Sequence, residues 1–181
     1  MKLEVRGLKD GTDCSGFFCG NKLLDDFFHN NVFMCCNHHF CSGYQVINRE
    51  TNEIVALFDL SFDSLKLEHD DMDDVLLERF DNVADMPDYF KNIFSKKEIF
   101  PALCISHLAV DRKYQSKGIG KFVVDSVCVL AKDQELAGCQ FVTVDAVIKQ
   151  AVVKFYHANG FYDAELPDPN RQTRRMYRLI I

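Results

Sequence analysis

The stretch His107-Leu-Ala-Val-Asp-Arg-Lys-Tyr-Gln-Ser-Lys-Gly-Ile-Gly-Lys121 carries the strongest structural signal in this chain. Its apolar start predicts the end of a strand, and the two glycines flanked by lysines predict a turn that opens a helix. The first turn of a helix presents free backbone N–H groups and the positive end of the helix dipole, and both attract phosphate oxygens. We therefore expect a phosphorylated ligand at this turn.

Two common phosphate-binding motifs do not fit these residues. A P-loop ending at Gly120-Lys121 requires Gly at the position of Gln115 and Ser or Thr at that of Phe122. A dinucleotide fingerprint starting at Gly118 requires Gly at the position of Val123, followed by an acidic ribose partner at a fitting distance. The turn therefore belongs to another class of phosphate site.

The chain continues from the turn as helix, strand and helix. Apolar residues after Ile119 recur at the spacing of an amphipathic helix, and a polar break from Asp133 to Gly138 ends the pattern. Residues 141–145 predict a strand, and Asn159-Gly160 after the next helical run is typical of a helix C-cap.

Gln115, Gly118 and Gly120 resemble the Q/R-x-x-G-x-G/A motif of the GCN5-related N-acetyltransferases, the GNAT superfamily. Residues 155–161, which read FY-x-x-x-GF, are similar to a second motif of that family. The resemblance implies an α/β fold with a central mixed, mostly antiparallel sheet, splayed between two parallel strands and flanked by helices. It also implies an acetyl-CoA-dependent N-acetyltransferase that moves an acetyl group to a primary amine of a small molecule or peptide by direct attack in a ternary complex.

The same resemblance assigns roles to residues. Tyr156 would be the general acid for the departing thiolate, because a phenol with a pKa of about 10 keeps its proton at neutral pH. Backbone groups of the strand would bind the pantetheine arm of the cofactor like an added strand, and the turn would hold its pyrophosphate. The implied cofactor-binding residues are Leu108, Ala109, Val110, Gln115, Ser116, Lys117, Gly118, Ile119, Gly120 and Lys121.

His107 is the candidate general base, since histidine titrates near neutral pH. It directly precedes the implied pantetheine-binding segment, but its side chain points to the face opposite that of Leu108, which equally fits a core histidine. Asp59, Ser61 and Asp145 are further candidates for the cleft wall. An α-amine acceptor, with a pKa of about 8, needs no dedicated base.

A narrower resemblance is to the toxin-type branch of the superfamily, which acetylates aminoacyl-tRNA. Phe18-Cys-Gly-Asn-Lys-Leu-Leu-Asp25, Leu60-Ser61 and residues 108–111 are similar to that branch, whereas His107 and Ser116 replace its usual Arg and Gly. The net charge of −6 disfavours a nucleic acid as a partner. The aminoacyl-tRNA enzyme therefore stays as an alternative, as does a catalytically inactive acyl-CoA-binding or interaction module.

Composition favours a single GNAT domain over residues 1–181, since 181 residues with 48% hydrophobic content support a sizeable core. No run approaches the roughly 20 apolar residues of a membrane span, and the charged N-terminus is not a signal peptide, so we expect a cytoplasmic protein. Eight cysteines then predict free thiols. We expect no metal site, because the cysteines and histidines of residues 35–41 lack zinc-finger spacing.

The remaining elements can be placed by pattern. We expect a strand at 3–5, a helix over 20–36, a hairpin of strands at 40–48 and 54–62, and strands at 102–110 and 173–181. Strict alternation would put Ile54, Ala56, Phe58, Leu60 and Phe62 on one face. Exchange of the C-terminal strand would be a route to a homodimer.

An acidic insert, residues 63–92, interrupts this order. Its segment from Glu68 to Asp88 holds nine acidic residues and one base, Arg79. We expect a solvated helix near Asp73 to Phe80 with acidic residues at its N-terminus. The alternative is a lid whose negative potential attracts a cationic amine.

Overall fold

The computed structural model describes residues 1–67, 88–164, 168 and 170–180. The helix expected near Asp73 to Phe80 lies outside these residues. In chain order the elements are β1 (Leu3–Gly7), α1 (Lys22–Asp26), a π-helical segment (Phe27–Asn31), α2 (Val32–Asn37), β2 (Ser42–Asn48), β3 (Glu53–Lys66), α4 (Asp88–Ser95), β4 (Ile99–Val110), a 3-10 turn (Arg112–Tyr114), α5 (Ile119–Asp133), β5 (Phe141–Val147), α6 (Gln150–Ala158), β6 (Tyr162–Asp163) and β7 (Thr173–Leu179).

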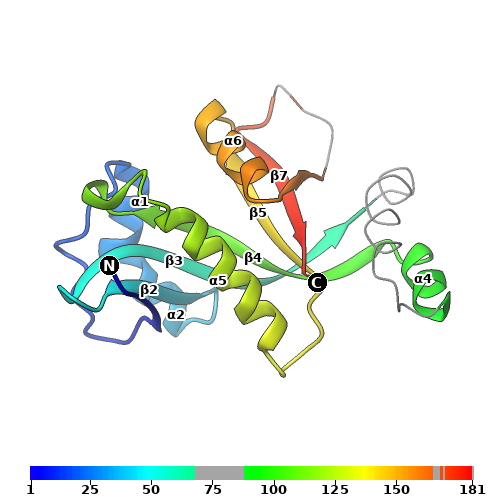
Figure 1. The fold of residues 1–181 in the computed structure, drawn as a ribbon, viewed down its shortest axis with the longest axis horizontal. Coiled ribbons are helices and arrows are strands. Elements are labelled where there is room, and N and C mark those ends of the chain that lie inside the picture. Colours follow the sequence, from blue (N-terminus) through cyan, green and yellow to red (C-terminus); the bar gives the residue numbers. More distant parts are fainter. Residues whose placement is uncertain (68–87, 165–167, 169, 181) are drawn as a thin grey trace.

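Seven strands form one sheet in the order β1-β2-β3-β4-β5-β7-β6. Among these described strands, β4 and β5 are the parallel pair and the other neighbours are antiparallel. The parallel pairing joins Ala102–Ile105 to Phe141–Val144 and ends there. Beyond it β5 and β7 leave the line of β4, as Figure 1 shows, so the expected splayed mixed sheet is confirmed.

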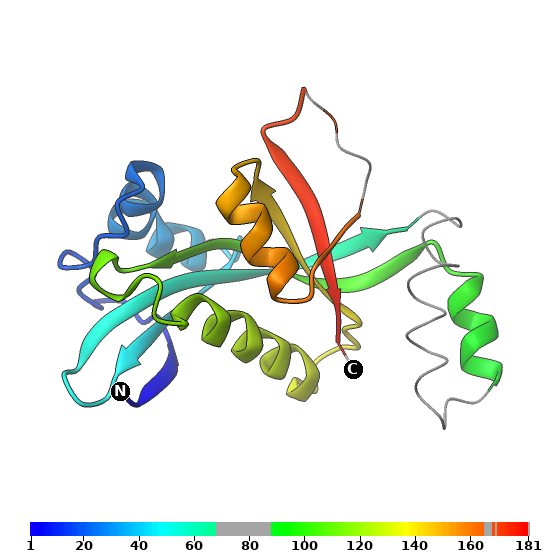
Figure 2. The same cartoon turned by 45° about the horizontal axis from the view of Figure 1, so that its top comes forward.

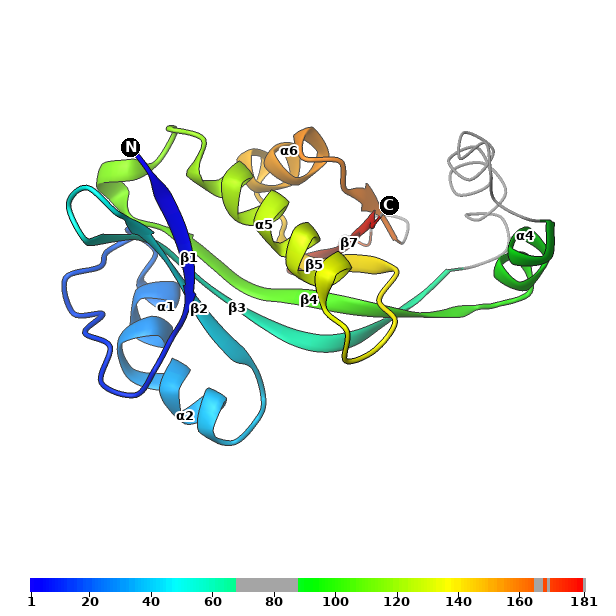
Figure 3. The same cartoon turned by 60° about the horizontal axis from the view of Figure 1, so that its bottom comes forward.

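Helices cover the two faces of the sheet differently. α5 and α6 lie on one face and α1 and α2 on the other (Figure 3). Val123, Val124 and Val127 of α5 are fully buried against Ala56 and Phe58 of β3 in the main core. A second cluster packs Phe28 and Val32 onto Leu57 and Ala109. Burying each of these large aliphatic or aromatic side chains stabilises the fold by about 1.5–3 kcal/mol.

β3 and β4 are longer than the sequence patterns predicted. Beyond the ends of β2 and β5 they continue as a two-stranded arm, and α4 lies at its far end, as Figures 1 and 2 show. A third cluster within this region joins Leu65, Phe100 and Phe141. Within the described residues, no helix is long and apolar enough to cross a membrane.

One bulge and the end of β2 correct the predicted alternation of side chains. The register of β2 and β3 shifts between Val46 and Ile47, which leaves Val55 as an extra residue. Ile54 therefore packs with the α1 and α2 cluster instead of the main core. Phe62 was also expected to be inward, but β2 has ended there and the side chain is 74% exposed.

The helix expected over residues 20–36 is interrupted. Asn21 caps α1 by accepting a hydrogen bond from the Leu23 N–H at 3.1 Å. The π-helical segment at Phe27–Asn31 then adds a residue to the turn before α2 begins. As a result Phe27 and Phe28 both face the sheet, where they surround the ring of His107.

Candidate active site

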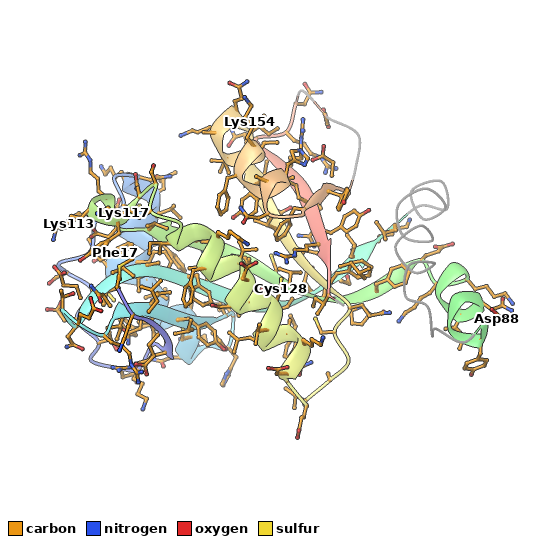
Figure 4. The ribbon with its side chains drawn as sticks, in the orientation of Figure 1. Phe17, Asp88, Lys113, Lys117, Cys128 and Lys154 are labelled. Atoms are coloured by element: carbon orange, nitrogen blue, oxygen red, sulfur yellow. The ribbon has the colours of Figure 1, made fainter. Side chains whose placement is uncertain are left out.

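A cleft of about 670 Å³ opens between the end of β4, the turn before α5, and α6. Figure 4 shows Lys113 and Lys117 near the turn and Lys154 on α6. The wall of the cleft includes every predicted turn residue except Lys117. It also includes the strand residues Leu108 and Val110 and the helix residues Phe155 and Tyr156. The structure therefore brings the two sequence motifs together in one cleft.

The open edge of β4 forms one side of this cleft. The Asp111 N–H donates to Val55 O at 2.9 Å, and Ala109 pairs with Leu57, so odd-numbered peptide groups face β3. In an extended strand the neighbouring groups of Leu108 and Val110 then face the side from which β5 has departed. Ala109 is buried on the other sheet face and its peptide groups pair with β3, so it does not line the cleft.

Interlocking hydrogen bonds hold the turn to the rest of the protein. Gln115 Nε2 donates to Cys19 O at 2.7 Å and to Val110 O at 3.1 Å. Asp111 Oδ1 accepts from the Lys113 N–H at 2.9 Å, and Asp111 Oδ2 accepts from the Phe18 N–H at 3.2 Å. The Gln115 side chain therefore links the turn to Cys19, which lies in the segment 18–25 of the toxin-type resemblance. The place of Gln115 in the sequence motif did not predict this structural role.

Two glycines shape the start of α5 in different ways. Gly118 has φ +80°, a left-handed conformation that favours glycine, and nothing lies within 4 Å of the position a Cβ would take. Ser116 adopts φ +59° without being glycine. At Gly120 a Cβ would approach the Phe155 ring to 3.0 Å, so this glycine permits close packing of α5 on α6.

The cationic side chains of the turn have local partners. Lys121 Nζ lies 2.6 Å from Asp125 Oδ2, and Lys117 Nζ lies 5.2 Å from the centroid of the Tyr114 ring. Backbone N–H groups and the α5 dipole therefore remain the main attraction for a pyrophosphate.

Tyr156 is wedged between neighbouring aromatic rings on α6 and beyond it. Its ring makes edge contacts with Phe155 and Phe161 at centroid distances of 5.0 and 5.2 Å. Burial raises the pKa of the Tyr156 phenol, and the nearby Cys104 raises it further. The hydroxyl has no hydrogen-bond partner among the described residues, and the residue lines the cleft. It is therefore a packing residue whose phenol keeps its proton at neutral pH.

His107 lies on the opposite sheet face from Tyr156. Its ring stacks on Phe27 at 3.8 Å, and Nδ1 is 3.1 Å from both carboxylate oxygens of the buried Asp59. Asp59 Oδ1 also accepts the His107 N–H at 2.6 Å. The side chain remains 36% exposed, so His107 is an oriented, accessible imidazole. Its role as general base stays a prediction.

The other predicted wall residues do not form one group. Asp59 accepts hydrogen bonds from His107. Ser61 and Asp145 instead line a smaller cavity with Arg175 and Asp63. Arg175 and Asp63 are 112 positions apart in sequence, so only the strand order of the folded sheet brings them together.

Comparisons with known proteins agree with this geometry. An acetyltransferase (GNAT) domain model matches residues 83–163, and no curated protein matches the chain significantly in sequence.

Solved structures match along nearly the whole chain. A bacterial toxin has 18% identity and a TM-score of 0.71 over 99% of this chain and 91% of its own. A tyrosine-to-phenylalanine variant of KacT has 19% identity and a TM-score of 0.71, covering 99% and 96%. AtaT complexed with acetyl-methionyl-tRNAfMet has 18% identity and a TM-score of 0.69, covering 96% and 94%. At these identities the structures show a common fold. The domain match over residues 83–163 and this common fold together support an acetyltransferase (GNAT) domain in this chain.

Proposed function

We propose that this protein transfers the acetyl group of acetyl-CoA to the α-amine of an aminoacyl-tRNA. The observation that carries the proposal is the similarity, along nearly the whole chain, to toxin acetyltransferases, one of which was solved with acetyl-methionyl-tRNAfMet. The net charge of −6 disfavours this acceptor, but the fold match along nearly the whole chain favours it over a small amine or peptide.

The residues of the cleft fit acetyl-CoA. The peptide groups of Leu108 and the N–H of Val110, whose carbonyl is bonded to Gln115, offer a strand edge for the pantetheine arm. The space beside Gly118 leaves room for phosphates at the start of α5. When bound, acetyl-CoA supplies an activated acetyl thioester. The cofactor-binding residues proposed here are those implied by the sequence motif.

Tyr156 would serve as the general acid. Its raised pKa keeps the phenolic proton on oxygen at any physiological pH, and no described residue competes for that proton. The hydroxyl would give this proton to the leaving sulfur. The α-amine of the acceptor, with a pKa of about 8, is partly neutral at pH 7 and loses its proton to solvent or to His107.

A small-molecule or peptide amine is the second candidate acceptor, and one observation favours it. The described arginines of β7 are all engaged by carboxylates: Arg174 by Asp163, Arg175 by Asp63 and Asp145, and Arg178 by Asp125. They are therefore not an open surface for a phosphate backbone. A tRNA would have to be held by exposed lysines instead, such as Lys154 on α6.

The test is transfer of labelled acetyl to a panel of acceptors. Purified protein is incubated with acetyl-CoA and separately with aminoacyl-tRNAs, polyamines, free amino acids and peptides, with Tyr156→Phe as the control. We expect acetylated aminoacyl-tRNA and growth arrest on expression. Acetylation of only small amines or peptides would establish the second candidate, and acetyl-CoA binding without turnover on any acceptor would indicate an inactive module.

A further inference from the structure

A second cavity, of about 300 Å³, opens where β4 and β5 separate. Its lining comes from β3 (Ser61, Phe62, Asp63), β4 (Cys104, Ser106), β5 (Asp145) and β7 (Arg175). Ser106 and Asp145 directly follow the last parallel pair, Ile105 with Val144. Val144 packs into the core beneath α5, so the neighbouring Asp145 points to the other face. The cavity and Tyr156 thus flank one strand separation from opposite faces.

An ion-pair network fixes the charge of this cavity. Arg175 donates through Nη1 to Asp145 Oδ2 at 3.1 Å and through Nη2 to Asp63 Oδ2. Thr143 Oγ1 also donates to Asp63 Oδ2, at 2.5 Å. Two carboxylates therefore face one guanidinium, which leaves a net negative charge. Asp63 and Arg175 are tightly engaged, whereas Asp145 Oδ1 has no partner among the described residues and its side chain is 54% exposed.

A pair of hydroxyls stands at the same separation. Ser61 Oγ and Ser106 Oγ are 3.1 Å apart, so one of them donates to the other. The hydroxyl that accepts this bond keeps its own hydrogen free for a further acceptor. The register of β3 and β4 shifts between Asp59 and Leu60, which inserts Ser106 as an extra residue and turns it toward the cavity.

We propose that this cavity is the acceptor subsite and that it recognises an α-aminoacyl group. Asp145 Oδ1 binds the α-ammonium, and the Ser61 and Ser106 hydroxyl pair donates to the adjacent carbonyl. Arg175 and Asp63 are positioning residues, because they hold Asp145 and complete the charge. The proposal rests on the proposed function and deepens it: an aminoacyl ester or amide carries both groups, whereas a polyamine lacks the carbonyl.

Binding without transfer tests the subsite. Dissociation constants of L-methioninamide are measured by NMR titration of the full chain without acetyl-CoA. Methylthiopropylamine, which has the same amine and side chain but no carbonyl, is the matched probe. We expect Asp145→Asn to weaken L-methioninamide binding by at least about fivefold, the size of a charge-assisted hydrogen bond at a half-exposed site. Ser106→Ala should weaken L-methioninamide about threefold and leave methylthiopropylamine unchanged.

Asp163→Asn is the control, since it removes a carboxylate that pairs with a β7 arginine outside the cavity. Equal binding by wild type and Asp145→Asn, or an equal loss in Asp163→Asn, would overturn the proposal. Titration calorimetry should give the same acetyl-CoA affinity for wild type and for all variants. A loss of acetyl-CoA affinity in the variants would indicate misfolding and would also count against the subsite. Subsite binding with no acetylation of any aminoacyl-tRNA would retain the subsite and remove the proposed function.

Discussion

The most informative perturbation is Tyr156→Phe, because the structure predicts opposite outcomes for stability and for turnover. The ring is held by Phe155 and Phe161, and the substitution leaves both edge contacts in place. The hydroxyl makes no hydrogen bond to the described residues, so its removal costs little. Because Tyr156 lines the open cleft, where water can solvate its hydroxyl, we expect the variant to be about as stable as wild type.

Turnover should fall because the general acid is gone. Proton transfer by a positioned side chain contributes about 10²- to 10⁴-fold to a rate, which corresponds to about 2.7–5.4 kcal/mol of transition-state stabilisation. We therefore expect kcat to drop by at least about two orders of magnitude. The affinity for acetyl-CoA should stay unchanged, since the peptide edge and the turn are untouched.

Three measurements on one preparation decide the matter. Thermal unfolding gives Tm, titration calorimetry gives the acetyl-CoA dissociation constant, and a thiol-release assay gives kcat across pH. Wild-type kcat should rise with the neutral fraction of the amine and show no descending limb below about pH 10, because the raised pKa of Tyr156 keeps its proton in place. An unchanged kcat, or a loss of kcat that accompanies a large fall in Tm, would refute the assignment.

Three further predictions concern the turn and His107. Gly118→Glu should abolish acetyl-CoA binding by calorimetry, because an anionic side chain enters the open space beside the turn; Gly118→Ala should cost about 1 kcal/mol in the left-handed conformation and retain most of the affinity. Gly120→Ala should lower the free energy of unfolding by about 1–3 kcal/mol in denaturant titrations, because its Cβ meets Phe155 at 3.0 Å; full stability would mean that α5 and α6 move apart freely. His107→Gln should lower kcat at least about 10²-fold with little change in Tm, because the amine then loses its proton acceptor; a lower Tm with an unchanged kcat would make His107 a structural partner of Asp59.

The cleft could be predicted from the sequence because its determinants are local. Gly118, Gly120 and the amphipathic pattern after them specify a turn and a helix through short-range geometry alone. The FY-x-x-x-GF motif places Tyr156 in the last turn of α6, which ends at Ala158, and puts Gly160, with φ +78°, just beyond its C-cap. These features depend on neighbours within a few residues, so single-sequence patterns reveal them.

The cavity proposed as the acceptor subsite could not be predicted, because its lining depends on strand register and strand order. An extra residue at Val55 moves Ile54 to the other face, and an extra residue at Ser106 creates the hydroxyl pair; period-two patterns reveal neither bulge. The contact of Asp63 with Arg175 arises only once β5 and β7 have paired beside β4. The π-helical turn that directs Phe27 toward His107 is likewise set by tertiary packing.

The separation of β5 from β4 at Ser106 also explains why the proposed acetyl-CoA edge and the proposed acceptor subsite lie next to each other. β4 stays paired with β3 from Ile99 to Val110, although β5 pairs with it only as far as Ile105. The antiparallel ladder therefore keeps β4 extended and its free edge in place without help from a ligand. A binding edge that is already ordered loses little conformational entropy when it is used, which favours affinity for an extended arm. The same departure of β5 opens the smaller cavity that Ser106 and Asp145 line, so a single strand separation supplies both the proposed donor edge and the proposed acceptor subsite.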